Sequence, residues 1–178
     1  MYRSRRAVLA TALAALLISA ATPAFGAPGQ TGSHVNKALA AVRTATSQYH
    51  SEEAAIDAGY VRTDDCVSIP GGGMGYHYVN FTLMGDPTLD PERPEVLLYA
   101  DSGNGRRLVA VEWIQLWSSD PNAVPPTGTL VPSMFGTALD GWMPGHFPGM
   151  PWHAELHAWV WAANPDGVFA GFNPNIDC

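Results

Sequence analysis

The chain has 178 residues, a formal net charge of −7 at neutral pH and 47% hydrophobic residues, which suffices for a folded domain with a core. Only nine residues are basic, against 16 acidic ones, and the sequence contains no basic patch interleaved with aromatic residues. We therefore expect no nucleic-acid partner, because binding to phosphates requires a concentration of Lys and Arg.

Residues 1–26 have the layout of a secretory signal peptide. Arg3, Arg5 and Arg6 precede an apolar run over 7–21, and small residues stand near a plausible cleavage point after residue 26. The run is shorter than the about 20 residues that span a membrane, which favours cleavage over an uncleaved anchor. The stretch 4–9 also resembles a twin-arginine export signal. The predicted location is thus extracellular or in the cell envelope.

Cleavage would remove three basic residues and leave 6 basic against 16 acidic residues, a net charge of −10. Such an acidic surface argues against binding to anionic membranes. Residues 27–34 are small and polar and predict a flexible leader, and residues 35–178 predict a single globular domain. The sequence predicts no oligomeric state.

The two cysteines, Cys66 and Cys178, indicate one disulfide, since an even number of cysteines in an exported chain favours pairing. The alternative, two free thiols that bind a metal, is poorer because neither lies in a CxxC spacing. A bond between them would tie the last residue to the region that follows the first predicted helix.

The first predicted element is one Ala-rich helix over residues 36–58. Apolar residues recur there at steps of three and four, Asn36 is a candidate N-cap, and Gly59 a candidate stop. The following GGGMG, residues 71–75, predicts a flexible loop; it lacks the GK[ST] of a phosphate-binding loop.

Strands are predicted at residues 76–80, 95–100, 108–117 and 153–161. The second and third are joined by a short DSGNG turn and predict a β-hairpin. Residues 118–151, with seven prolines and five glycines, predict an irregular connection. The fold class is therefore α+β, with a long N-terminal helix on a mostly antiparallel sheet. A β-sandwich or barrel with one extra helix is the alternative.

The fourth strand places His153, Glu155 and His157 on one face, together with Trp159 and Trp161. The other face, Ala154 to Val160, is small and aliphatic and suited to packing under the helix. As a helix the segment would not match the zinc-protease pattern, since Ala154 stands where that pattern needs Glu.

Further ligand-capable residues lie on the other strands. Glu112 is expected to be buried, because both faces of its strand are apolar, and a buried carboxylate needs a cation, a metal, hydrogen-bond donors or a proton. His77 lies among apolar strand residues, and His146 lies in a proline-rich segment that can hold it over the sheet.

These residues predict a site for a divalent transition metal such as zinc, copper, iron or manganese, since imidazole and carboxylate suit these ions. The candidate ligands are His77, Glu112, His146, His153 and His157. We expect His77, His153 and His157 to bind the ion, with Glu112 or His146 completing the set. Glu155 is a candidate general base. Ordinary hydrogen-bonded His–Glu pairs remain the alternative, because the convergence of the strands is assumed.

Five stretches together resemble an uncharacterised family of exported bacterial proteins: GMGYHYVN, PEVLLYA, LVAVEW, MPGHFPGMPWHAELHAWVW and NPDGVFAGFNPNIDC. The resemblance runs from about residue 49 to the end of the chain. It implies a single exported domain and supplies no mechanism. Similarity to cupins is limited to ligand chemistry, because their motif order is reversed here, and the His153-x-Glu155 spacing is similar to that of two-His-one-carboxylate iron oxygenases.

Three functions therefore stay open. The first is an exported metal-binding protein, with a catalytic or a storage role. The second is a metal-free module that binds a small ligand in a pocket lined by Trp113, Trp159 and Trp161. The third is a structural protein in which the same His and Glu residues form a buried polar network.

Overall fold

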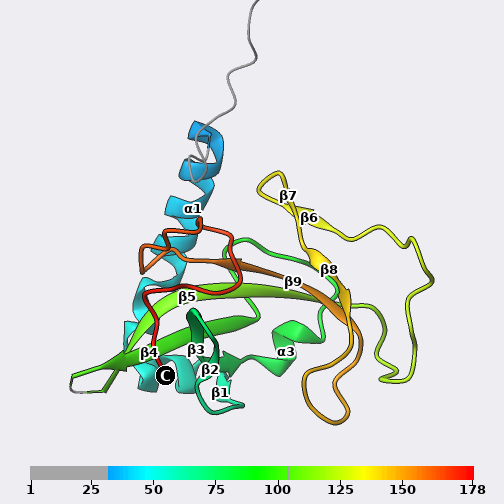
Figure 1. Ribbon diagram of the computed structural model, residues 1–178, viewed down its shortest axis with the longest axis horizontal. Helices are drawn as coiled ribbons and strands as arrows, with labels where there is room; N and C mark the ends of the chain where they lie inside the picture. Colours follow the sequence, from blue (N-terminus) through cyan, green and yellow to red (C-terminus); the bar gives the residue numbers. More distant parts are fainter. Residues whose placement is uncertain (1–31, 104) are drawn as a thin grey trace, which may run out of the picture.

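The computed structural model describes residues 32–103 and 105–178 of the chain (Figure 1). The predicted signal peptide, residues 1–26, and the first part of the predicted leader lie outside the described residues. Residues 33 and 34 of that leader belong to the first helix. Within the described ranges, no helix is long and apolar enough to span a membrane.

The segment expected to form one long helix contains three shorter ones, so that prediction was wrong. α1 spans Ser33–Thr46, the 3₁₀ helix η1 spans Ser47–His50, and α2 spans Glu52–Asp57. The break lies at Ser51, whose backbone is extended and whose side chain accepts a hydrogen bond from the N–H of Ala54. Ser51 is thus an N-cap that starts a new helix. The expected stop holds, since α2 is followed by Gly59 at φ +94°.

A mostly antiparallel sheet forms the centre of the molecule, with strand order β1-β3-β4-β5-β9-β8 and β2 paired to β3. A separate hairpin, β6-β7, and the short helix α3 lie in the connections. The bounds are β1 Val61–Arg62, β2 Val67–Ile69, β3 Gly72–Val79, α3 Phe81–Met84, β4 Val96–Ser102, β5 Gly105–Leu116, β6 Ser133–Met134, β7 Thr137–Ala138, β8 Asp140–Met143 and β9 His153–Ala158.

All four predicted strands are present, and the predicted hairpin is β4-β5. The region over 118–151 is less irregular than expected, because its β8 adds to the edge of the sheet beside β9. The last predicted strand is shorter than expected: β9 ends at Ala158, where the N–H of Val160 turns back to the carbonyl of Ala158.

One face of the sheet packs against α1, which crosses behind the strands in Figure 1. Leu39 and Val42 of α1 belong to the same buried cluster as Leu97, Tyr99 and other strand residues. The aliphatic face of the fourth strand was expected to lie here, and Ala154, Leu156, Ala158 and Val160 all belong to this cluster.

The opposite face is covered by loops and by the C-terminal segment, which is red in Figure 1. The expected flexible loop over 71–75 is instead mostly part of β3, which is a correction. A Cβ on Gly73 would lie 2.7 Å from the carbonyl oxygen of Ile176, and one on Gly72 would lie 3.0 Å from the backbone of Asn173. The glycines therefore let the C-terminal segment approach the strand closely.

The predicted disulfide joins Cys66 to Cys178, with 5.4 Å between the Cα atoms and a sequence separation of 112 residues. It fastens the end of the chain beside the β1-β2 connection. Within the described ranges no free cysteine is left to act as a metal ligand.

Candidate metal centre

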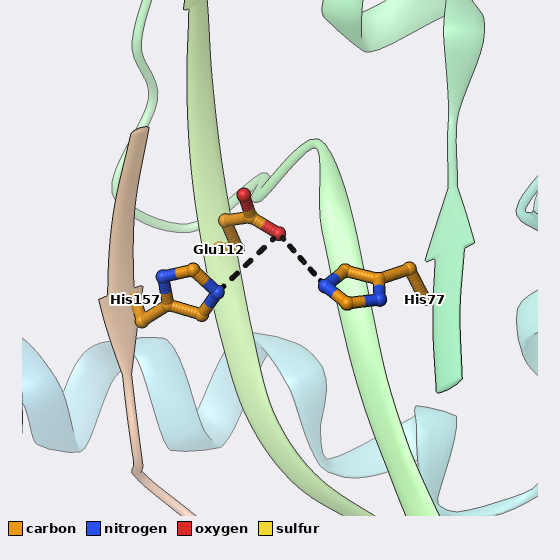
Figure 2. Close-up of side chains that lie close together, drawn as sticks. All are labelled: His77, Glu112 and His157. Carbon is orange, nitrogen blue, oxygen red and sulfur yellow. Dashed lines mark ion pairs between the residues drawn. The ribbon is translucent and has the colours of Figure 1, made fainter. Parts of the chain in front are cut away.

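Three of the predicted ligands meet on the sheet face that the C-terminal segment covers. Glu112 of β5 is paired with His157 of β9, and His77 of β3 reaches over β4 from the other side. Figure 2 shows the imidazole rings on opposite sides of the carboxylate, each with Nε2 turned toward it. Both Nε2 atoms lie 3.8 Å from Oε2 of Glu112. Nitrogen and oxygen ligands of one tetrahedral zinc ion are about 3.3 Å apart, so small movements would bring these atoms to coordination distance.

Glu112 and His157 bring atoms without hydrogen-bond partners to this point. Glu112 is 2% exposed and His157 is fully buried. Oε2 of Glu112 and both ring nitrogens of His157 are buried without any hydrogen bond. Unpaired polar atoms are expensive inside a protein, and their clustering at one point favours a bound ligand there.

A carboxylate lies behind His77. Oδ2 of Asp64, in the β1-β2 connection, is 2.8 Å from Nδ1 of His77, and Oδ1 accepts the backbone N–H of His77 at 2.9 Å. The ring contact is an ion-pair distance without the alignment of a good hydrogen bond. A carboxylate at Nδ1 favours the tautomer with its proton on that atom, which leaves the lone pair of Nε2 for a metal, and metal-binding histidines are usually oriented in this way.

Burial controls the ionisation of Glu112 and His157. Burial, and after it the charge of Glu155, raises the pKa of Glu112 well above its ordinary value. Burial lowers the pKa of His157 to about 4, so its imidazole is neutral at physiological pH. The neutral imidazole is the form that binds metals, and a divalent cation would stabilise the ionised form of Glu112.

Two further groups of residues offer ligand atoms that lie within 4.8 Å of one another. One contains His146, His153 and Glu155, and the other contains Asp140, Glu155 and His157. Although burial opposes it, the hydrogen bond with His153 lowers the pKa of Glu155 to about 2. Glu155 is therefore ionised.

The predicted ligands thus divide differently from the expectation. His77 and His157 meet at Glu112, but His153 belongs to a second group with His146. Two residues were missed: Asp64, behind His77, and Asp140, at the sheet edge. Nothing in the sequence near Asp64 marks it, because its role comes from the pairing of β1 with β3, which aligns distant parts of the chain.

A pocket of about 780 Å³ opens beside the site, and His77, Glu112, His146 and Glu155 all line it. The rest of its lining is mostly apolar, with Met74, Ile114, Met143, Phe147, Met150 and Phe172 among the residues.

The three tryptophans expected to line a pocket do not line this one. Trp113 is fully buried on the α1 side of the sheet. Trp161 lies beyond the end of β9, where it donates to Oγ1 of Thr46. Trp159 is buried and donates to the carbonyl of Ala170. These side chains stabilise the fold rather than form the pocket wall. Trp159 and Trp161 lie beyond Ala158, where the alternation of β9 ends, and Trp113 lies on the opposite face of β5 from Glu112.

No protein-family model, curated protein sequence or solved structure matches the chain. A function for this protein is therefore assigned from the positions, burial and charges of its own side chains.

Proposed function

We propose that the protein is an exported metal-binding protein that holds a divalent transition metal ion between His77, Glu112 and His157. The observation that supports this most strongly is the convergence of buried atoms without hydrogen bonds, Oε2 of Glu112 and Nε2 of His157, beside Nε2 of His77. Two imidazoles and one carboxylate suit zinc, iron, manganese or copper. The Cys66–Cys178 disulfide is consistent with an oxidising compartment outside the cytoplasm.

The pocket favours a chemical role over storage. His77 and Glu112 line it, so an ion between them would face a space large enough for a small molecule. Three protein ligands leave a coordination position for water or a substrate group, and a bound metal lowers the pKa of such a water. The low pKa of Glu155 makes it a weak base, which favours Glu155 as a ligand over the general base that the sequence suggested.

The test is the metal content of the protein, exported from its host and purified without a His tag. We expect at least one ion per chain in the wild type and a loss of the ion at this site in Glu112→Gln, which keeps the shape of the side chain. His50→Ala is the matched control, because His50 packs on Trp161 and belongs to none of the three groups. A wild type without metal, whose melting temperature does not change when zinc, copper, iron or manganese is added, would contradict the proposal.

The second candidate is a metal-free module that binds a small apolar ligand, and the 780 Å³ pocket favours it. Such a module would keep its stability and its ligand in the presence of a chelator. A purely structural network is less well supported, because such a network is expected to satisfy its buried members and both ring nitrogens of His157 are unpaired.

A further inference from the structure

The three groups of ligand-capable residues form one continuous row across the sheet. The middle group, Asp140, Glu155 and His157, shares His157 with the group around Glu112. It shares Glu155 with the group that contains His146 and His153. Adjacent groups that share ligands are typical of centres with two ions, where one side chain contacts both.

His153 is oriented in the same way as His77. Its ring is fully buried, with Nδ1 3.3 Å from the carbonyl oxygen of Pro151 and Nε2 3.2 Å from Oε2 of Glu155. The carbonyl of Pro151 and the carboxylate of Glu155 thus hold the ring from both sides, with Nε2 facing Glu155. An ion bound between Nε2 and Oε2 would take the place of the hydrogen bond that joins them.

The loop that carries His146 is held over His153. The two rings are 4.7 Å apart and nearly perpendicular, and the backbone N–H of His146 contacts the sulfur of Met150. A Cβ on Gly145 would lie 2.1 Å from the carbonyl oxygen of Met150, so the loop closes tightly on itself at this point. His146 itself is exposed and lines the pocket together with Glu155.

The row is rich in carboxylates, which are ligands for divalent cations. Four carboxylates line the pocket, those of Asp64, Glu112, Asp140 and Glu155, and no Lys or Arg is among its described lining residues. Glu112 and Glu155 are the two buried carboxylates of the pocket, and they belong to different end groups of the row, so each can hold one ion.

We propose that this protein holds two divalent transition metal ions, the first at His77, Glu112 and His157 and the second at His146, His153 and Glu155. Glu155 lies between the two positions and is the candidate for a shared ligand, because the two oxygens of a carboxylate can bind two ions. The inference rests on the proposed function for the first ion and adds a second site. In two-metal centres the ions are about 3.5–4 Å apart and jointly bind one oxygen-containing substrate.

The test is the number of Co²⁺ and Mn²⁺ ions bound by chelator-stripped full-length protein, measured by calorimetric titration and by elemental analysis. We expect two ions per wild-type chain and one per chain in His146→Ala, which removes an exposed side chain and is therefore expected to fold. His50→Ala should retain two. Mn²⁺-loaded wild type should give the electron paramagnetic resonance spectrum of two coupled ions, and His146→Ala the six-line spectrum of an isolated one.

The outcomes separate the two proposals. One ion per wild-type chain would overturn the second site and leave the first proposal standing, and zero ions would overturn both. Two ions in both the wild type and His146→Ala would place the second ion elsewhere and overturn this assignment, and so would two uncoupled Mn²⁺ ions.

Discussion

The carboxylate of Asp64 contacts His77 twice, through Nδ1 of the ring at 2.8 Å and through the backbone N–H at 2.9 Å. The same ring turns its other nitrogen toward Glu112. Asp64 is thus in a position to fix both the backbone and the tautomer of a proposed metal ligand without binding the metal itself.

Asp64→Asn should weaken metal binding without abolishing it. The amide cannot stabilise the proton on Nδ1 as a carboxylate does, and loss of such a partner typically costs about 10- to 100-fold in metal affinity. Competition with a chromophoric chelator measures this. The control is Asp65→Asn at the next position, whose side chain is 99% exposed and paired only with Arg62. Equal affinities of Asp64→Asn and the wild type would argue that His77 is not a ligand.

Glu112→Gln should stabilise the metal-free protein increasingly as the pH rises. The folded-state pKa of Glu112 is well above the ordinary value of 4.5, so the folded chain binds more protons than the unfolded chain above that pH. The contribution of protonated Glu112 to the free energy of unfolding is complete below about pH 4.5. It is lost as the pH rises toward the folded-state pKa, by up to about 1.4 kcal/mol per pH unit. Gln at this position does not ionise and avoids the loss.

Urea unfolding in chelator between pH 5 and 8 measures this difference, with the exposed Glu53→Gln as the control for an ordinary glutamate. Because Glu112 and Glu155 interact, the comparison reports on the titration of this pair. With metal bound, the wild type should be more stable than Glu112→Gln, because the ion requires the ionised carboxylate. A difference independent of pH would show that Glu112 is ionised in the metal-free fold.

Local patterns were sufficient to predict the strands and much of the site. The alternation of β9 correctly separated Ala154 and Leu156 from His153 and His157, because the period of a strand is fixed by its backbone. The burial of Glu112 followed from the apolar residues on both faces of its strand. These inferences needed only near neighbours in the sequence.

Long-range contacts were not predictable in the same way. The roles of Asp64 and Asp140 depend on which strands pair, and the close approach of the C-terminal segment to Gly73 depends on the whole fold. The grouping of His153 with His146 depends on the path of a loop rather than on strand alternation. The helix break at Ser51 did have a local signal, the Ser-Glu-Glu start of α2, which the apolar periodicity concealed.

Replacing both Cys66 and Cys178 by Ser should destabilise the protein by roughly 4 to 5 kcal/mol, the chain-entropy estimate for a loop of this length. Metal affinity should fall as well, because Asp64 lies two residues before Cys66 in the same connection. Urea unfolding and the chelator competition measure the two effects. An unchanged urea midpoint would mean that the bond restricts the unfolded chain very little.

Gly75→Ala should cost much more stability than Gly71→Ala, although both residues have positive φ, +92° and +101°. A Cβ at Gly75 would lie 2.2 Å from the carbonyl oxygen of Tyr99, whereas nothing lies within 4 Å of one at Gly71. Gly71→Ala should therefore show only the backbone cost, about 1–2 kcal/mol, and Gly75→Ala must in addition push β3 away from β4.

Because His77 follows Gly75 by two residues on β3, the displacement should also move Nε2 of His77 away from Glu112. Gly75→Ala should then bind the first metal ion more weakly, while Gly71→Ala should bind it like the wild type. Thermal melting and metal titration of the two variants measure both effects. If the two variants lose equal stability and bind metal equally well, the close packing of β3 on β4 is not what positions His77.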